Sequence, residues 1–453
     1  MPFTATVDGT SALSFVNAAL PLLILPGFGL LTCGLVQRKN AAHLVMLTFS
    51  AYVFAVLAYY LVGYAVEFGG LSSASTAAPA ASGSFLIGHG GWGVIGGSHF
   101  FLRGAGRGDL AIATLALGFL LAASCALVGA VCERITFGGF LLCDVFLAGV
   151  LYPIFGCWVW GGGWLAQTGV TMGLGHGFVD FAGSSVVHTV AGFGAMALSI
   201  LLGPRLGKYA LNRQPRAFPA HNIVFVVIGA LLLLIGLLGL ELSAAEPGSG
   251  RVGAVVVNSN IAAAAGAAAA MLYWQIAFGK PDISMACNGL LAGLVSISAS
   301  CAFVGPIASM LIGAVAGLVV SAGVLLNERI LKIDDPCGSI AVHGYCGWLG
   351  AVALGIFSDG SYGAGWNGVG ATAYLGRAGA GVTGLLYGDP SQFEVQLAGA
   401  TLCAVYALVA TYLVFKLADH FYPIRAEAEA EVEGLDLPQF GMLAYGENEQ
   451  LPG

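Results

Sequence analysis

The sequence predicts an all-α polytopic membrane protein with eleven transmembrane helices: an inverted five-plus-five helix repeat and a final helix. Three observations lead to this prediction. Only 9% of the 453 residues are charged, whereas 58% are hydrophobic. A soluble protein carries roughly 25% charged residues, so a soluble fold is excluded. The chain also contains eleven long apolar runs and a duplicated histidine motif.

The apolar runs are long enough to cross a membrane, which takes about 20 residues in a helix. The first run lacks the basic start of a signal peptide, because no Lys or Arg precedes Arg38, so we expect it to be a spanning helix. The expected spans are about 12–35, 44–68, 110–131, 138–160, 183–203, 222–243, 252–277, 286–303, 306–328, 340–357 and 393–420.

The basic residues predict the orientation. With the N-terminus outside and the C-terminus inside, the inner loops and tail hold twelve of the sixteen Lys and Arg residues. The outer loops hold only Arg103, Arg107, Arg251 and Arg377. This bias favours an N-out, C-in arrangement.

The sequence predicts that the chain consists of a transmembrane domain and a C-terminal tail. Residues 1–424 form a transmembrane domain, with an inverted repeat of about 12–203 and 222–357 and an eleventh helix at about 393–420. Residues 425–453 form a cytosolic tail, whose PQFGMLAY stretch is expected to dock on the inner loops. The ten cysteines form no C-x-x-C pair and are expected to be buried thiols. No basic stripe supports nucleic acid binding.

The motif D-x-x-G-S-x-x-V-H-x-x-x-G occurs twice, as DFAGSSVVHTVAG at residues 180–192 and DPCGSIAVHGYCG at residues 335–347. The copies open the fifth and tenth expected spans, the last spans of two five-helix units. Units with an odd number of helices are inverted relative to each other, and such repeats enclose a substrate path. Each histidine follows its aspartate by about 12 Å of helix rise. We therefore expect His188 and His343 to meet near the middle of the membrane.

The two histidines are predicted to be functional, because an ionisable group inside a membrane is costly and marks a substrate or proton path. The alternative is that each is a core histidine with a polar neighbour. A metal site is poorly supported, since zinc needs three or four ligands and no carboxylate or cysteine stands at ligand spacing. Asp180, Asp334 and Asp335 are expected to cap helix N-termini. Asp180 is also a candidate for an electrostatic role at the outer mouth.

Several stretches resemble the ammonium transporter family (Amt/Mep/Rh), and the chain looks like a bacterial Amt-like member. They are PGFGLLTCGLVQRKNAAH, CERITF, VWGGGWL, DFAGSSVVHTVAG, PAHNIVFVVIGA, GKPDISMACNGLLAGLVSIS, IDDPCGSIAVHG and GLDLPQFGMLAY, in this order. The resemblance covers nearly the whole chain. Because several independent motifs agree in order and spacing, it is highly specific.

The resemblance implies a homotrimer with one narrow pore in each subunit. NH4+ is recruited by an aromatic cage at an outer vestibule and loses its proton, and NH3 and H+ then pass two histidines. Matched by motif, the pore histidines are His188 and His343, the outer aspartate is Asp180, the vestibule tryptophan is Trp160 and the gating phenylalanine is Phe119.

The resemblance also implies ammonium transport for nitrogen uptake at the cell (plasma or inner) membrane. No nucleophile–base set or metal box appears in the sequence, so no enzymatic activity, cofactor or metal is expected. A cytosolic PII-type regulatory protein is the expected partner, docking on the inner loops and the tail.

One segment departs from the family pattern. Family members carry W-F-G-F-N-x-G-S in the sixth helix, whereas this chain reads L-L-G-L-E-L-S-A at residues 237–244. Leu240 replaces a gating phenylalanine, Glu241 replaces an asparagine and Ala244 replaces a vestibule serine. Ser243 stands one position early. The expected cage is therefore reduced.

The departures leave alternatives open. In the first, Glu241 supplies an anion that recruits ammonium, and it then faces the water-filled mouth or the trimer axis. In the second, conduction is reduced or absent and the protein is an ammonium sensor. Glu241 is otherwise a helix-end residue that reaches the membrane interface. A family aromatic is also absent at Leu115, and Gly338 stands where the tenth-helix motif has an aspartate.

Overall fold

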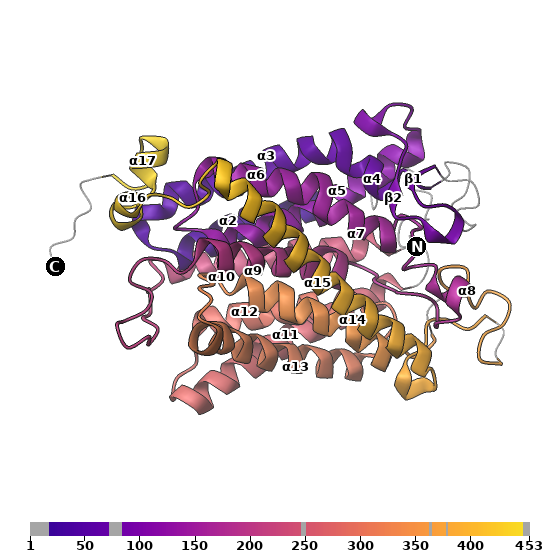
Figure 1. Ribbon diagram of the computed structural model, residues 1–453. Coiled ribbons are helices and arrows are strands. Elements are labelled where there is room, and N and C mark those ends of the chain that lie inside the picture. Colours follow the sequence, from indigo (N-terminus) through magenta and orange to yellow (C-terminus); the bar gives the residue numbers. More distant parts are fainter. Residues whose placement is uncertain (1–17, 72–83, 246–250, 362–364, 377–378, 447–453) are drawn as a thin grey trace.

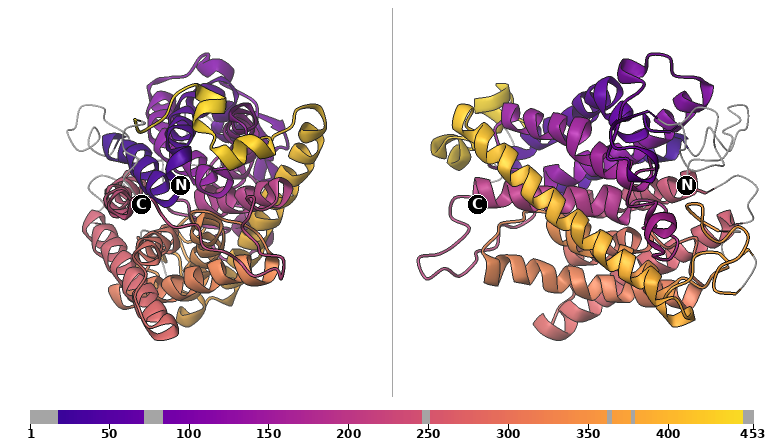
Figure 2. Two further views of the ribbon diagram at one scale, coloured as in Figure 1. Left: turned by 90° about the vertical axis from the view of Figure 1, so that its left-hand side faces the viewer. Right: turned by 45° about the vertical axis from the view of Figure 1, so that its right-hand side comes forward.

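The helices lie side by side along one long direction of the molecule (Figure 1). The structure is a computed structural model, and it describes residues 18–71, 84–245, 251–361, 365–376 and 379–446. The early helices occupy one half of the bundle and the later helices the other half, as the end-on view shows (Figure 2). One long helix, α15, crosses diagonally over the outside of both halves.

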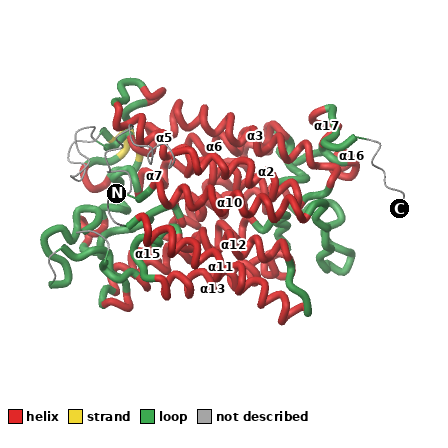
Figure 3. The backbone as a smooth tube through the Cα atoms, turned by 180° about the vertical axis from the view of Figure 1, so that it is seen from behind, coloured by secondary structure: helices red, strands yellow, loops and turns green. Residues whose placement is uncertain are grey.

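The two ends of the bundle differ. The tail helices α16 and α17 lie at one end, which is the inner end in the predicted orientation. The small hairpin β1–β2 and helix α8 lie at the other, outer end, together with most of the loops in Figure 3.

The first half contains helices interrupted by 3-10 and π-helical turns, labelled η. Their bounds are η1 Leu20–Leu23, α2 Ile24–Leu35, η2 Arg38–Asn40, α3 Ala41–Ala58, η3 Tyr59–Gly63, α4 Tyr64–Phe68, β1 Phe85–Ile87, η4 Gly90–Trp92, β2 Ile95–Gly96, η5 Phe100–Leu102, α5 Arg107–Val131, α6 Phe137–Phe146, η6 Leu147–Leu151, α7 Tyr152–Val159, α8 Thr168–Met172, η7 Ser184–Thr189 and α9 Val190–Leu202. The hairpin is antiparallel, with Phe85 opposite Gly96 and Ile87 opposite Ile95.

The second half also consists of helices with 3-10 and π-helical turns. Its elements are α10 Ile223–Ser243, α11 Val252–Phe278, α12 Ile283–Ile297, α13 Pro306–Leu325, η8 Leu326–Leu331, η9 Ile340–Tyr345, α14 Cys346–Phe357, η10 Leu385–Tyr387, α15 Pro390–Phe421, α16 Ala428–Glu433 and α17 Asp436–Phe440.

Nine helices of the described chain are long and apolar enough to cross a membrane. Two further apolar helices, Leu20–Leu35 and Ile283–Ile297, are shorter. The predicted membrane-spanning, all-helical fold is therefore confirmed, but the predicted count of eleven spans is not. The first predicted run begins outside the described residues. The predicted span 286–303 ends as a helix at Ile297, and the chain then turns before Pro306 begins α13.

The outward surface of the helices is apolar. Helix α10 exposes Val224 and Leu231, and α15 exposes Leu413 and Leu417, each to half or more of its surface. A water-soluble monomer rarely exposes apolar patches of this kind. This surface fits lipid or a neighbouring subunit, and the chain is a multi-pass membrane protein.

The two motif helices run antiparallel. Arg205 follows the end of α9, and it binds Asp334, which precedes the start of η9. One helix therefore begins where the other ends, as an inverted repeat requires. Gly192 and Gly344 allow the two backbones to touch, because a side-chain carbon at Gly192 would collide with the backbone of Gly344.

Candidate functional site

The two motif histidines lie together in the middle of the bundle. His188 is in the π-helical turn η7 and His343 is in the π-helical turn η9. Their Nδ1 atoms are 3.1 Å apart, and their rings are nearly parallel with centroids 5.1 Å apart. Both are buried, and the ring of Phe28 lies 5.6 Å from that of His343. The duplicated motif thus brings two imidazoles into contact, as the repeat predicts.

Both copies of the motif contain a glycine with a positive φ before the π-helical turn. Gly183 and Gly338 occupy the left-handed region, with φ values of 99° and 76°. Glycine adopts this conformation without the penalty that other residues incur. Gly183 stands one residue and Gly338 two residues before the π-helical turn that follows.

Asp180 caps the first motif helix. Its Oδ1 accepts hydrogen bonds from the backbone N–H groups of Gly183 and Ser184, at 2.9 and 3.0 Å. Its Oδ2 accepts from Ser185 and Val186, at 2.7 and 2.9 Å. Four N–H donors thus serve the two carboxylate oxygens at the positive end of a helix. The expected capping role is present.

The aromatic residues matched to the vestibule lie above this cap. The indole Nε1–H of Trp160 donates to the carbonyl of Asp180 at 2.7 Å. The ring of Phe119 meets that of Trp160 edge-on, with centroids 5.2 Å apart. Both rings are almost fully buried. One hydrogen bond therefore fixes the indole relative to the start of the histidine helix.

The residues of the divergent segment are buried among neighbouring helices. Leu240 packs beside Gly118, one residue before Phe119. The Ser243 hydroxyl donates to the carbonyl of Leu240 at 2.7 Å, within its own helix. Glu241 is fully buried, and its Oε1 lies 2.9 Å from the hydroxyl of Ser298 on α12.

The prediction that Glu241 faces the mouth or the trimer axis is therefore wrong, and so is the alternative of a helix end that reaches the interface. Helix α10 turns residue 241 toward α12 while residue 240 faces α5, because neighbouring helical residues differ by about 100°.

Asp335 and Asp334 behave differently from each other. Asp335 accepts the backbone N–H of Ile340 at 2.8 Å and caps its helix. Burial raises its pKa to about 7. Asp334 does not cap, which corrects that expectation. It forms a two-pronged ion pair with Arg205, at 2.8 Å from Nε to Oδ2 and 2.9 Å from Nη2 to Oδ1.

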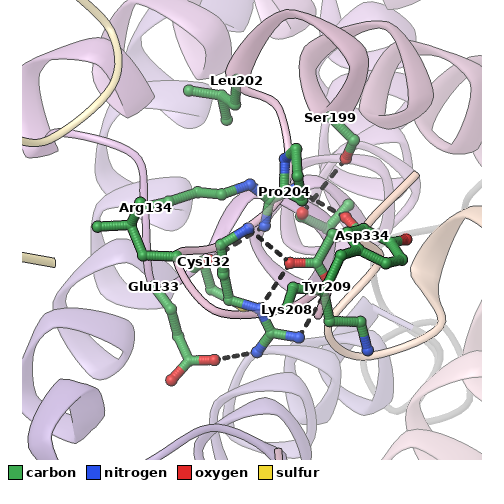
Figure 4. Close-up of polar contacts among 12 residues, drawn as sticks. Cys132, Glu133, Arg134, Ser199, Leu202, Pro204, Lys208, Tyr209 and Asp334 are labelled. Carbon is green, nitrogen blue, oxygen red and sulfur yellow. Dashed lines mark hydrogen bonds and ion pairs between the residues drawn. The ribbon is translucent and has the colours of Figure 1, made fainter. Parts of the chain in front are cut away.

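This ion pair is the centre of a buried network at the inner end (Figure 4). Arg205 also pairs with Glu133, and Arg134 donates to the carbonyl of Asp334 at 2.7 Å. Glu133 accepts in turn from the Asn40 side chain at 2.8 Å. Burial by itself would raise the pKa of Asp334, but the hydrogen bonds and charge of Arg205 hold it well below its usual range. Four inner loops are thereby tied together.

The tail docks on this end, as expected. Asp436 accepts the backbone N–H groups of Ala42 and His43 at the start of α3, at 3.1 and 2.8 Å. The rings of Phe440 and Tyr445 contact His43 and His221.

Glu67 is a buried acid that the motifs did not reveal. It lies in α4 with no exposed surface, and the Tyr59 hydroxyl donates to its Oε2 at 2.6 Å. The available signal was a single carboxylate inside the apolar run 44–68. Among the described residues, no group of three or more His, Cys, Asp or Glu side chains could hold a metal ion, and all ten cysteines are buried and free.

The chain is similar over nearly its whole length to known proteins. The family model described as Ammonium Transporter Family matches residues 12–445. Ammonium transporter Amt2 of Archaeoglobus fulgidus is 38% identical over 437 residues, covering 94% of this chain and 86% of the relative. The ammonium transporter of Bacillus subtilis is 31% identical, covering 96% of this chain and 98% of the relative.

Solved structures have the same fold. A "Sensor Amt Protein" matches with a TM-score of 0.81 and 26% identity, over 94% of this chain and 97% of the other. Mep2 of Candida albicans matches with a TM-score of 0.76 and 26% identity, over 96% of this chain and 90% of the other. With the family model spanning nearly the whole length and relatives above 30% identity, the chain belongs to the ammonium transporter family.

Proposed function

We propose that this protein transports ammonium across a membrane. NH4+ binds at the outer end beside Trp160 and Phe119 and loses its proton there. NH3 and H+ then pass His188 and His343 to the inner end. The protein acts as a transporter rather than as an enzyme, without a cofactor.

The contact between the two histidines carries this proposal. An Nδ1 to Nδ1 distance of 3.1 Å requires one ring to donate and the other to accept. The two Nε2 atoms then differ as well, since one is an acceptor and the other a donor. Such a pair can accept a hydrogen bond from ammonia on one ring and offer a proton from the other. The pair therefore suits a path for both NH3 and H+.

Selection against K+ follows from the chemistry of the substrate. A cation over an indole face gains about 0.5–2 kcal/mol, which concentrates NH4+ but does not exclude K+. Only NH4+ can lose a proton and continue as a neutral molecule. A bare cation faces a high desolvation cost among buried apolar side chains such as Phe28.

The further parts of the proposal rest on the family resemblance. We propose a homotrimer in the plasma or inner membrane, with residues 1–424 as the transport domain and 425–453 as a cytosolic tail. The docked tail and inner loops offer a surface for a PII-type regulator. A pull-down with a PII protein, with and without nucleotide and 2-oxoglutarate, that never retains this chain would contradict that partner.

Transport is tested by solid-supported membrane electrophysiology on the purified protein in liposomes. An ammonium jump should give a current, and a K+ jump should give none. A folded protein that yields no ammonium current above empty liposomes overturns transport and supports the sensor alternative.

A further inference from the structure

Glu67 is a membrane-buried carboxylate outside the histidine site. It lies one residue before the end of α4 at the outer end, and its side chain has no exposed surface. None of the ion pairs among the described residues includes it. An acid inside a membrane protein is costly and marks an ion or proton path by default.

Only half of this carboxylate is hydrogen-bonded. Tyr59 donates its hydroxyl to Oε2 at 2.6 Å. Oε1 has no hydrogen-bond partner in the described part of the chain. A buried negative charge with one open oxygen is poorly compensated, so Oε1 is a strong proton acceptor.

The open oxygen lies against the helix that carries the vestibule tryptophan. Oε1 occupies the space that a side chain at Gly156 would need. Residues 152 and 156 of α7 and residue 160, which directly follows this helix, lie on one face because they are four positions apart. Glu67 Oε1 therefore lies between the levels of Tyr152 and Trp160.

Tyr152 links Glu67 to the loop that carries Asp180 and precedes η7, which we call the pore loop. Its hydroxyl is buried, finds no hydrogen-bond partner among the residues described, and lies within electrostatic range of both Glu67 and Asp180. Asp180 cannot take a proton without losing backbone hydrogen bonds, since both of its oxygens already accept two each. Unlike Asp180, Glu67 therefore has a carboxylate oxygen that can take a proton without the loss of a hydrogen bond.

Two π-helical turns lie in the backbone around Glu67, Tyr59 and Tyr152. The π-helical turns η3 and η6 pack against each other, with Gly63 fitting beside the carbonyl of Ala148. This packing sets the rings of Tyr59 and Tyr152 6.2 Å apart. Single π-helical turns occur mostly at functional sites.

The other titratable groups around Glu67 are neutral or lie farther away. Tyr64 and the Cys157 thiol face it along with Tyr59 and Tyr152. Tyr64 donates its hydroxyl to the carbonyl of Asp109 at 3.0 Å, so this aspartate lies beyond the phenol ring.

We propose that Glu67 is the proton acceptor for ammonium at the outer end. The proposal rests on the proposed transport function. An N–H bond of NH4+ breaks and an O–H bond forms on Glu67 Oε1, directly or through the Tyr152 hydroxyl. Ammonia remains as the neutral product, the carboxylate becomes a neutral acid, and nothing is oxidised or reduced.

The test measures current and protonation separately, on full-length protein in liposomes. Glu67→Gln should lower the ammonium current by about 10²-fold, the lower end of what a positioned acid–base group contributes. Tyr59→Phe keeps the carboxyl and should lose less. A purely structural hydrogen bond predicts the reverse, because glutamine still accepts from Tyr59. Glu394→Gln, an exposed acid on α15, is the matched control and should behave as wild type.

Infrared difference spectroscopy gives the second readout. Perfusing ammonium over the wild type should raise the C=O band of a protonated carboxyl, K+ should not, and Glu67→Gln should lack the band. If Glu67→Gln gives the same ammonium current and the same infrared band as the wild type, this proposal is overturned. The proposed transport function is then unaffected. If the wild type gives no current, transport fails, and the band alone decides whether Glu67 takes the proton. If Glu67→Gln does not fold, Glu67→Asp replaces it, and a band of unchanged frequency overturns the proposal.

Discussion

The Nδ1 atoms of His188 and His343 lie 3.1 Å apart, although 155 positions separate the two residues in the chain. Each comes from a π-helical turn at the start of an antiparallel partner helix. The contact makes the two rings unequal, since one donates and the other accepts. In the proposed transport path this contact is the conducting element, and the region of Trp160 is the recruiting element.

Replacing His188 by aspartate should change conduction and leave recruitment intact. The substitution removes the shared Nδ1 hydrogen bond and places an acid in the pore centre, whereas Trp160 and Phe119 keep their contacts. We expect the maximal ammonium current to change by about tenfold or more, with the half-saturating concentration within about twofold. Electrophysiology over a range of ammonium concentrations measures both, with exposed His420→Ala as control. An unchanged maximal current with a shifted half-saturation would contradict the assignment.

Replacing Trp160 by leucine should weaken recruitment. The indole provides the cation-binding face, and its loss removes about 0.5–2 kcal/mol, or about two- to thirtyfold in half-saturating concentration. Trp274→Leu is the matched control, because Trp274 stacks on Phe278 in α11, away from the pore loop. The same concentration series measures the shift. A half-saturation equal to wild type would remove Trp160 from the vestibule.

Glu241→Gln should leave the half-saturating concentration within about twofold at both low and high salt. Glu241 is fully buried, so it neither attracts ammonium from water nor is screened by counterions. The Ser298 hydroxyl also lies 2.8 Å from the carbonyl of Leu294, and its single proton cannot serve both oxygens. A protonated Glu241 satisfies both contacts, and glutamine reproduces its donor.

The contrary outcome for Glu241→Gln is equally measurable. A half-saturation that rises mainly at low ionic strength would restore the anion role that the sequence suggested. Trp160→Leu in the same assay shows that a recruitment defect can be detected.

The helices could be predicted because each one is a long apolar run, and the histidine contact could be predicted because the motif is duplicated at one spacing. The π-helical turns could not, since a π-helical turn differs from an α-helical one by a single hydrogen-bond shift that leaves no residue signature here. The direction of Glu241 was missed for a different reason. The position of a residue in the sequence motif places it near the vestibule. The orientation of the helix about its own axis decides whether its side chain faces the pore or a neighbouring helix.

Asp334 shows the same limit for charged residues. The sequence places it before a helix, where a capping role is expected, but Arg205 lies 129 positions away and only the fold brings them together. Glu67 could be noticed as a lone acid in an apolar run. Its partners could not be identified: Tyr59 lies eight positions earlier in the same helical run, at the start of a π-helical turn that the sequence did not predict, and Tyr152 comes from a different helix.

Arg205→Ala should be the most destabilising of these changes. It leaves Asp334 and Glu133 as buried carboxylates without their cation, and breaking such a pair costs about 3–5 kcal/mol.

The pKa of Asp334 lies below its usual range in the folded protein. A depressed pKa adds stability that is present above the unfolded value of about 3.9 and is lost as the pH falls through the folded value. The wild type should therefore lose stability on acidification, and Arg205→Ala should lose less because its pair is already absent. Unfolding in detergent at a series of pH values measures this, with exposed Lys280→Ala as control. Equal stability of Arg205→Ala and wild type at neutral pH would mean that the inner network does not hold the four loops together.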